Sequence, residues 1–175
     1  NQADFRKDVH LVNDRFVLDS DTLKYNTETH VSDILGPTVI VYEEETTIHS
    51  TLGWYNTETE KSMLLNRSRI VHVDGQTMTG DTIFYDKRSG YGRALRNIAS
   101  TDSTNHITLY GHYCEMHENG PRGKNSGFAT DSALMVDWSD SLVYTYMHGD
   151  TLYTSEVPYR YYELRERDSV LIDSV

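Results

Sequence analysis

The sequence has few of the residues that indicate helices, disulfide bonds or a membrane span. One cysteine, Cys114, occurs among 175 residues, so no disulfide can form within the chain, and the cysteine count alone leaves the compartment open. Only three prolines are present, and this low number favours β-structure throughout the chain. No segment places apolar residues at helical spacing over three turns. No apolar run approaches the roughly 20 residues that a membrane-spanning helix needs.

Positive charge is also scarce. Lysine and arginine together number 16 against 27 aspartates and glutamates, which gives a formal net charge of −11. Nucleic-acid binding needs a basic patch that neutralises phosphates, so this charge argues against nucleic acid as a partner. It also argues against attraction to an anionic membrane surface.

The residues that are abundant favour β-structure. Thirteen tyrosines, with many threonines and valines, are typical of strands. A chain of 175 residues is long enough to bury one proper core. We therefore expect one all-β domain.

One short motif recurs at an interval of 30 residues. Tyr-Asn-Thr-Glu-Thr occupies residues 25–29 and 55–59, and a looser copy occupies residues 85–89. Each copy follows a run of β-branched, aromatic and aliphatic residues, so each predicts a strand followed by a turn. Such a period is typical of a fold built from one small repeated unit. Since the three tyrosines share a register, we expect an aromatic ladder formed by Tyr25, Tyr55 and Tyr85.

A second apolar segment follows each tyrosine. Leu35, Leu65 and Leu95 occupy equivalent places, and apolar runs follow at residues 39–42 and 70–73. Adjacent residues of a strand point to opposite faces, so apolar residues at both positions predict that both faces are covered. We expect one face to pack as a core and the other to line an apolar channel.

The repeat weakens towards the C-terminus. Residues 112–120 align with residues 82–90 as a fourth unit, and residues 120–127 predict a long surface loop. Four aspartates recur where strands are expected to begin, where a carboxylate accepts backbone N–H bonds and caps a turn. We therefore assign a structural role to these four: Asp21, Asp81, Asp131 and Asp150.

No arrangement of reactive side chains predicts catalysis. The sequence contains no nucleophile elbow, phosphate-binding glycine loop, zinc-protease helix or dinucleotide fingerprint. His112 and His117 flank Cys114, but residues five apart on a strand face opposite sides and do not converge on a metal ion. We expect neither an enzyme nor a metal or cofactor site.

The order of the units resembles a known family. Units of the form Asp-Thr-Leu-x-Tyr-(Asn/Asp), a polar turn, an aliphatic pair and a Val/Ile strand resemble the OstA-like (LptA-type) periplasmic domains of lipopolysaccharide transport. Residues 110–116, 129–134 and 148–153 are especially similar to the branch found in Bacteroidetes-type bacteria. The resemblance covers roughly residues 10–157 and rests on the order and spacing of several short motifs.

This resemblance implies a fold and a function. Members of the family wind short antiparallel strands into a twisted, open β-jellyroll, or β-taco, whose V-shaped interior holds the acyl chains of lipid A. They are not enzymes, and they stack edge strand against edge strand into a bridge between the inner and outer membranes of Gram-negative bacteria. The implied partners are lipopolysaccharide, other Lpt-type bridge components and head-to-tail copies of this chain. The implied location is the periplasm, after export of a precursor whose signal peptide is absent here.

Apolar residues along the units are the candidates for a lipid-binding groove. An acyl chain needs only continuous apolar area, worth roughly 0.8 kcal/mol per buried methylene. Groove and core positions are both expected among Leu23, Leu35, Ile40, Leu65, Ile70, Ile83, Leu95, Leu134, Val136 and Leu152. Lipid A carries phosphate and the chain is acidic, so binding also requires basic residues at the rim of the groove, drawn from Lys24, Arg67, Arg69, Arg93 and Arg96.

The same units set the domain boundaries. We assign residues 1–157 to a single OstA-like domain and residues 158–175 to a C-terminal edge segment or linker. Residues 161–167 allow at most one or two turns of helix.

Two other function classes stay open at this point. A period of about 30 residues with aromatic residues in register also fits a parallel β-helix, as in enzymes that cleave polysaccharides. A scaffold or adhesin repeat that binds a protein is the third class. The turns Asp74-Gly75 and Ser89-Gly90 predict hairpins, and hence antiparallel neighbours, which favours the lipid-binding class over the β-helical enzyme.

Overall fold

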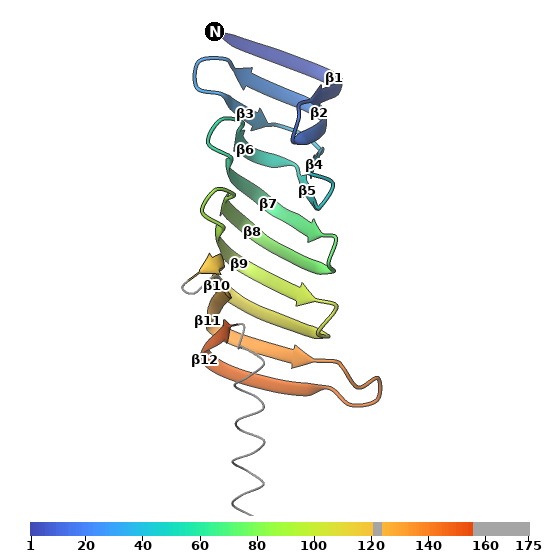
Figure 1. The fold of residues 1–175 in the computed structure, drawn as a ribbon, viewed down its shortest axis with the longest axis vertical. Helices are drawn as coiled ribbons and strands as arrows, with labels where there is room; N and C mark the ends of the chain where they lie inside the picture. Colours follow the sequence, from blue (N-terminus) through green and yellow to red (C-terminus); the bar gives the residue numbers. More distant parts are fainter. Residues whose placement is uncertain (121–123, 156–175) are drawn as a thin grey trace, which may run out of the picture.

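All the strands lie in one antiparallel sheet. The computed structural model describes residues 1–120 and 124–155, and Figure 1 shows their strands following one another along the length of the molecule. The strands are β1 (Gln2–Val12), β2 (Phe16–Asn26), β3 (Val31–Ile34), β4 (Thr38–Tyr42), β5 (Thr46–Ser50), β6 (Leu52–Asn56), β7 (Lys61–His72), β8 (Gln76–Asp86), β9 (Tyr91–Asp102), β10 (Ile107–Gly120), β11 (Lys124–Asp137) and β12 (Thr145–Ser155). The described residues contain no helix, so the expected all-β antiparallel fold is confirmed.

The sheet is open at both ends. Among the described residues, β1 pairs only with β2, and β12 pairs only with β11. Near the N-terminus, four short strands take the place of two long ones, because β3 and β6 pair in one half of the sheet while β4 and β5 pair in the other. Each end strand therefore has a free edge with backbone N–H and C=O groups available for pairing.

A crease crosses the long strands near their middle. The pairing register shifts there, for example between Arg6 and Val9 in β1 and between Leu65 and Ser68 in β7. At the shift in β7, two consecutive residues have left-handed backbone, with φ angles of 62° and 59°, and such irregularities bend a strand. Equivalent left-handed pairs occur at Lys7-Asp8 in β1, Arg96-Asn97 in β9 and Asp131-Ser132 in β11.

Small side chains line the inner side of the crease. Ser20, Thr38, Ser50 and Ser68 are buried. Their hydroxyl oxygens are satisfied by one another, at 2.6 Å for Ser20 with Thr38 and 2.8 Å for Ser68, which donates to Ser50. The same line continues through buried Gly80, Gly111 and Ala133. Because these side chains are short, the two halves of each strand can fold towards each other.

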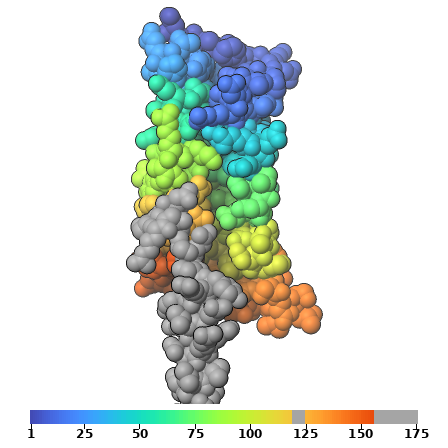
Figure 2. Space-filling view, in the orientation of Figure 1, coloured from blue at the N-terminus to red at the C-terminus, as the bar shows by residue number. Residues whose placement is uncertain are grey.

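The crease divides the sheet into two facing walls. We call the half that contains β3 and β6 wall A, and the half that contains β4 and β5 wall B. In Figure 2 the side chains form two columns that each follow the colour order of the chain. The walls pack against each other, because the ring of Phe16 in wall B meets the ring of Tyr55 in wall A edge-on, with 5.5 Å between centroids.

Two rows of inward-facing residues run across the sheet, and we call them the inner rows. The wall A row consists of Leu23, Ile34, Gly53, Leu64, Ile83, Ala94, Cys114, Ala129 and Leu152. The wall B row consists of Leu18, Ile40, Ile48, Ile70, Met78, Ser100, Leu109, Met135 and Met147. Most of their apolar members belong to one core. Burial of each leucine or isoleucine contributes roughly 1.5–3 kcal/mol.

The 30-residue repeat corresponds to a pair of wall A strands with its turn. The Asn of each Tyr-Asn-Thr-Glu-Thr motif accepts two backbone N–H bonds of the following turn, at 2.9 and 3.1 Å for Asn26 and at 3.0 and 2.7 Å for Asn56. The turn then closes through a left-handed residue, which is His30, Glu60 or Gly90. Successive turns are joined, since Thr57 N–H donates to the carbonyl of His30 at 2.9 Å. The motif therefore encodes turn chemistry.

The predicted aromatic ladder is wrong. Tyr25, Tyr55 and Tyr85 do lie in one row on wall A, but Ser32 pairs between the first two and Ser62 pairs between the second and third. The period of 30 residues spans two strands, so equivalent tyrosines lie two strands apart and cannot stack. Each serine instead leaves space beside the large rings.

The predicted positions of the four recurring aspartates and of a long loop need correction. Instead of lying where strands begin, the aspartates lie at the crease, inside long strands. Asp81 there accepts a hydrogen bond from Asn97 Nδ2 at 2.7 Å. Residues 120–127 are not a long loop, because β10 extends to Gly120 and β11 begins at Lys124.

The hairpins at residues 74–75 and 89–90 are confirmed by the antiparallel pairing of β7 with β8 and of β8 with β9. The segment 158–175 lies outside the described residues.

We expect Gly53→Ala to destabilise the fold by about 1–3 kcal/mol. Gly53 has φ +148°, and an added Cβ would lie 2.3 Å from the carbonyl oxygen of Met63. Gly149→Ala is the matched control, because its nearest heavy atom would lie at an ordinary 3.5 Å. Urea unfolding of both variants measures the difference, and equal midpoints would contradict the predicted strain.

Candidate functional site

The predicted groove residues divide between the two faces of the sheet. Leu23, Ile40 and Ile83 lie on the inner rows and are completely buried in the core. Ile70 and Leu152 also lie on the inner rows, where they are half-buried and pack against that core. These five line the interior between the walls.

The other five predicted residues lie on the outer face and do not line the interior. They are Leu35, Leu65, Leu95, Leu134 and Val136. The first three follow directly after the inward-facing residues Ile34, Leu64 and Ala94, so strand alternation turns them outwards, and Leu35 and Leu95 are 44% and 38% exposed. Sequence alignment of the units did not indicate which member of each aliphatic pair faces inwards.

Polar contacts join the walls at their mouth near the N-terminal end. Glu60 is only 8% exposed, and its carboxylate accepts a hydrogen bond from the guanidinium of Arg15 in the turn between β1 and β2. Arg88 Nε lies 3.8 Å from the other oxygen of the same carboxylate. Lys87 Nζ lies 5.0 Å from the centroid of the Tyr42 ring, within reach of a cation–π contact. The Arg15 and Lys87 contacts cross between the walls, whereas the Arg88 contact joins two turns of wall A.

Burial also sets the protonation state of the inward-facing tyrosines in this region. The pKa of Tyr55 is raised, chiefly because burial disfavours the phenolate. The pKa of Tyr85 is raised for the same reason, and its hydroxyl donates to Glu118 Oε1 at 3.1 Å. Burial therefore keeps both phenols in their neutral form.

The interior changes character towards β12. The wall A inner row carries Leu64 and Ile83 in β7 and β8, but only Ala94, Cys114 and Ala129 in β9 to β11. The wall B inner row ends at Met147 in β12, which is 51% exposed. The wall A side chains are thus smaller in β9 to β11 but still buried, and Met147 in β12 is an accessible apolar residue of the inner face.

The residues considered for metal binding point in different directions. Cys114 is buried on the inner face, whereas His117 is exposed on the outer face, where its ring lies 5.1 Å from the ring of Tyr91. Across residues 1–120 and 124–155, no group of three or more His, Cys, Asp or Glu side chains is placed to hold a metal ion.

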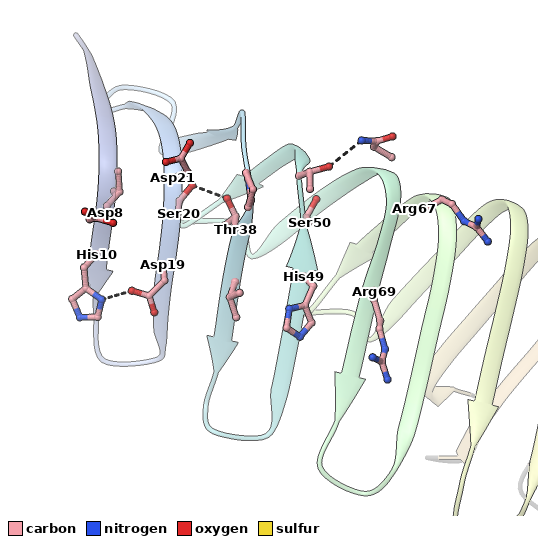
Figure 3. A pocket seen from close by; sticks show the side chains of 15 residues that line it. Asp8, His10, Asp19, Ser20, Asp21, Thr38, His49, Ser50, Arg67 and Arg69 are labelled. Carbon is pink, nitrogen blue, oxygen red and sulfur yellow. Dashed lines mark hydrogen bonds and ion pairs between the residues drawn. The ribbon is translucent and has the colours of Figure 1, made fainter.

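The basic residues expected at the rim of the groove lie elsewhere. Lys24 and Arg93 occupy outward-facing positions of wall A, and Arg96 is exposed at the crease. Arg67 and Arg69 line a cavity of about 690 Å³ on the outer side of the crease, spanning β1 to β7 (Figure 3). This cavity, which lies outside the walls, was not predicted. The pattern in the sequence that indicates it is a serine flanked on both sides by charged residues, at Ser20 and at Ser68.

Comparison with known proteins leaves the family open. No protein-family model and no curated protein matches the chain. No helix of the described residues is long and apolar enough to cross a membrane.

We expect the Cys114 thiol to resist alkylation in the native protein. Burial raises its pKa from 9.0 to about 11, and the thiolate is the reactive form. Iodoacetamide at pH 8 should label it only after denaturant unfolds the chain. The neutral thiol stabilises the folded state below pH 9, and this contribution is lost as the pH rises towards about 11.

Cys114→Ala is the control for both measurements. It should remove all labelling and, in urea unfolding followed against pH, the part of the alkaline destabilisation due to the thiol. Labelling of the folded protein as fast as a free thiol would contradict the burial of the Cys114 side chain.

Proposed function

We propose that this chain is a non-catalytic lipid-binding domain of the OstA-like (LptA-type) kind, which carries the acyl chains of lipopolysaccharide across the periplasm. The observation that carries the proposal is the pair of inner rows, which extend an inner face from β2 to β12 that is apolar apart from Ser100. Acyl chains need continuous apolar area and no directional ligand, and each methylene that leaves water contributes roughly 0.8 kcal/mol.

The C-terminal half of the interior is the place where an acyl chain enters in this proposal. The larger inner-row side chains of wall A, such as Leu64 and Ile83, belong to the N-terminal part of the core, and Arg15 and Glu60 join the walls there. In β9 to β11 the wall A inner row carries only the small side chains of Ala94, Cys114 and Ala129. Met147, in the last strand β12, is accessible. Methionine is flexible and adapts to irregular apolar partners, which suits a lipid tail.

Head-to-tail assembly is part of the same proposal. Nine antiparallel pairings lead from β1 to β12, an odd number, so these two strands run in opposite directions. The free edge of β12 in one copy can therefore pair antiparallel with β1 of the next copy. In that arrangement the wall A inner row continues from Leu152 to Phe5, and the apolar interior extends through the assembly.

The strand pairing favours this proposal over a β-helical enzyme. A parallel β-helix requires parallel pairs between successive coils, whereas every pair among residues 1–120 and 124–155 is antiparallel. A scaffold or adhesin repeat that binds only protein is tested by the lipid experiment.

Photo-crosslinking at two adjacent positions of β12 tests lipid binding. A photo-reactive amino acid at Met147, on the inner face, should form an adduct with lipopolysaccharide. The same residue at Tyr146 is the matched control, because Tyr146 is 65% exposed against 51% for Met147 but faces outwards. Equal adducts at both positions, or none at Met147, would show that the inner face does not hold the lipid.

Engineered cysteines test head-to-tail pairing. Opposite residues of an antiparallel pair lie about 4.5–5.5 Å apart, which suits a disulfide. Under mild oxidation, Phe5→Cys/Leu152→Cys should give a ladder of covalent oligomers in a non-reducing gel, because Phe5 and Leu152 lie in the same inner row at opposite ends. In the control Phe5→Cys/Met147→Cys the second cysteine belongs to the other row. A ladder of equal strength in the control, or no ladder in either, would argue against this pairing.

A further inference from the structure

The cavity outside the walls arises from the same crease that folds the sheet. The inward-facing residues Ser20, Thr38, Ser50 and Ser68 each lie between two residues that turn outwards, because side chains alternate along a strand. The outward pairs line the cavity: Asp19 and Asp21 in β2, Pro37 and Val39 at β4, His49 and Thr51 at β5, and Arg67 and Arg69 in β7. Short buried hydroxyl side chains thus place a set of outward side chains around one hollow.

Opposite charges occupy opposite ends of this cavity. Asp8, Asp19 and Asp21 project from β1 and β2, while Arg67 and Arg69 project from β7 (Figure 3). The register runs from Asp19 through Val39 and His49 to Arg69, three strand steps that correspond to about 14 Å between Cα atoms. No ion pair joins the two ends among the described residues.

The basic end has no partner within the chain. Among residues 1–120 and 124–155, the side chains of His49, Arg67 and Arg69 make no hydrogen bond or ion pair. At the acidic end Asp19 pairs with His10 at 2.6 Å, whereas the carboxylate of Asp8 has no such partner. Arg67 and Arg69 lie two residues apart on one strand, and guanidinium groups without a carboxylate partner suit a phosphate, which accepts several N–H bonds.

We propose that this cavity binds a phosphorylated amine, with the phosphate at Arg67 and Arg69 and the ammonium group at Asp8 and Asp21. A ligand that carried only negative charge would face three aspartates in the same hollow, and one that carried only positive charge would face the arginines. A zwitterion is complementary to both ends. The apolar Pro37 and Val39 lie between them and contact the spacer.

The size of the cavity fits a molecule larger than the zwitterionic group itself. Its volume of about 690 Å³ lies within the roughly 300–1,000 Å³ of small-molecule sites. A free phosphorylated amine and the headgroup of an aminophospholipid share the recognised chemistry. The site is separate from the interior between the walls, so this inference does not depend on lipid transport.

Calorimetric titration with phosphoethanolamine at low salt tests the inference. Ethyl phosphate lacks the ammonium group and ethanolamine lacks the phosphate, so each should bind the full chain at least about tenfold more weakly, as expected for loss of a charge-assisted interaction. Vesicles of phosphatidylethanolamine present the same zwitterion on a lipid. Binding of the free compound identifies a solute site, and binding of the vesicles alone identifies a headgroup site.

Variants assign any binding to the cavity. Arg67→Gln/Arg69→Gln should weaken binding of phosphoethanolamine or the vesicles at least about tenfold. Asp8→Asn/Asp21→Asn should remove the preference over ethyl phosphate. Arg96→Gln is the matched control, because Arg96 is also an exposed, left-handed residue at the crease but does not line the cavity. Thermal unfolding checks that each variant folds.

Three results would overturn the inference. They are binding of neither form of the zwitterion, equal binding of ethyl phosphate, and equal loss with Arg96→Gln and with the Arg67/Arg69 variant. Lipopolysaccharide crosslinking at Met147 should be unchanged by Arg67→Gln/Arg69→Gln, so the cavity and the lipid-binding proposal can fail separately.

Discussion

The bend of the strands at the crease is the constraint on which the rest of the structure depends. A strand of 11 residues such as β2 has an apolar inner face along both of its halves, and in a flat sheet that face would meet water. Small side chains such as Ser20, Ser68 and Gly111 let the halves approach, so that each inner row covers the other. Larger side chains along this line would hold the walls apart and expose the core.

The crease also separates two surfaces with different chemistry. Its inner side leads to apolar rows that are filled near β2 and more accessible near β12. Its outer side carries the charged residues that alternate with the buried hydroxyls, which is why an acidic chain presents Arg67 and Arg69 together. One geometric feature therefore produces both the interior proposed for acyl chains and the cavity proposed for a zwitterion.

Sequence reasoning predicted the class of the fold better than the faces of its strands. The motif Tyr-Asn-Thr-Glu-Thr predicted strand and turn correctly, because Asn26 and Asn56 bond the turn amides locally. It did not predict that Ser32 would lie between Tyr25 and Tyr55, since the partner strand is set by long-range pairing. The register shift at the crease likewise interrupts the simple alternation by which inward residues are counted along a strand.

The sequence by itself determined the all-β class, the hairpin turns and the 30-residue unit, because these depend on local propensity and on turn residues that act over a few positions. Only the tertiary structure decided which face each apolar residue occupies, that Glu60 meets Arg15, and that Asp19 and Arg69 border one cavity. These relations join residues 45 and 50 positions apart in the chain. They exist because the creased strands bring the two walls and their outer surfaces into register.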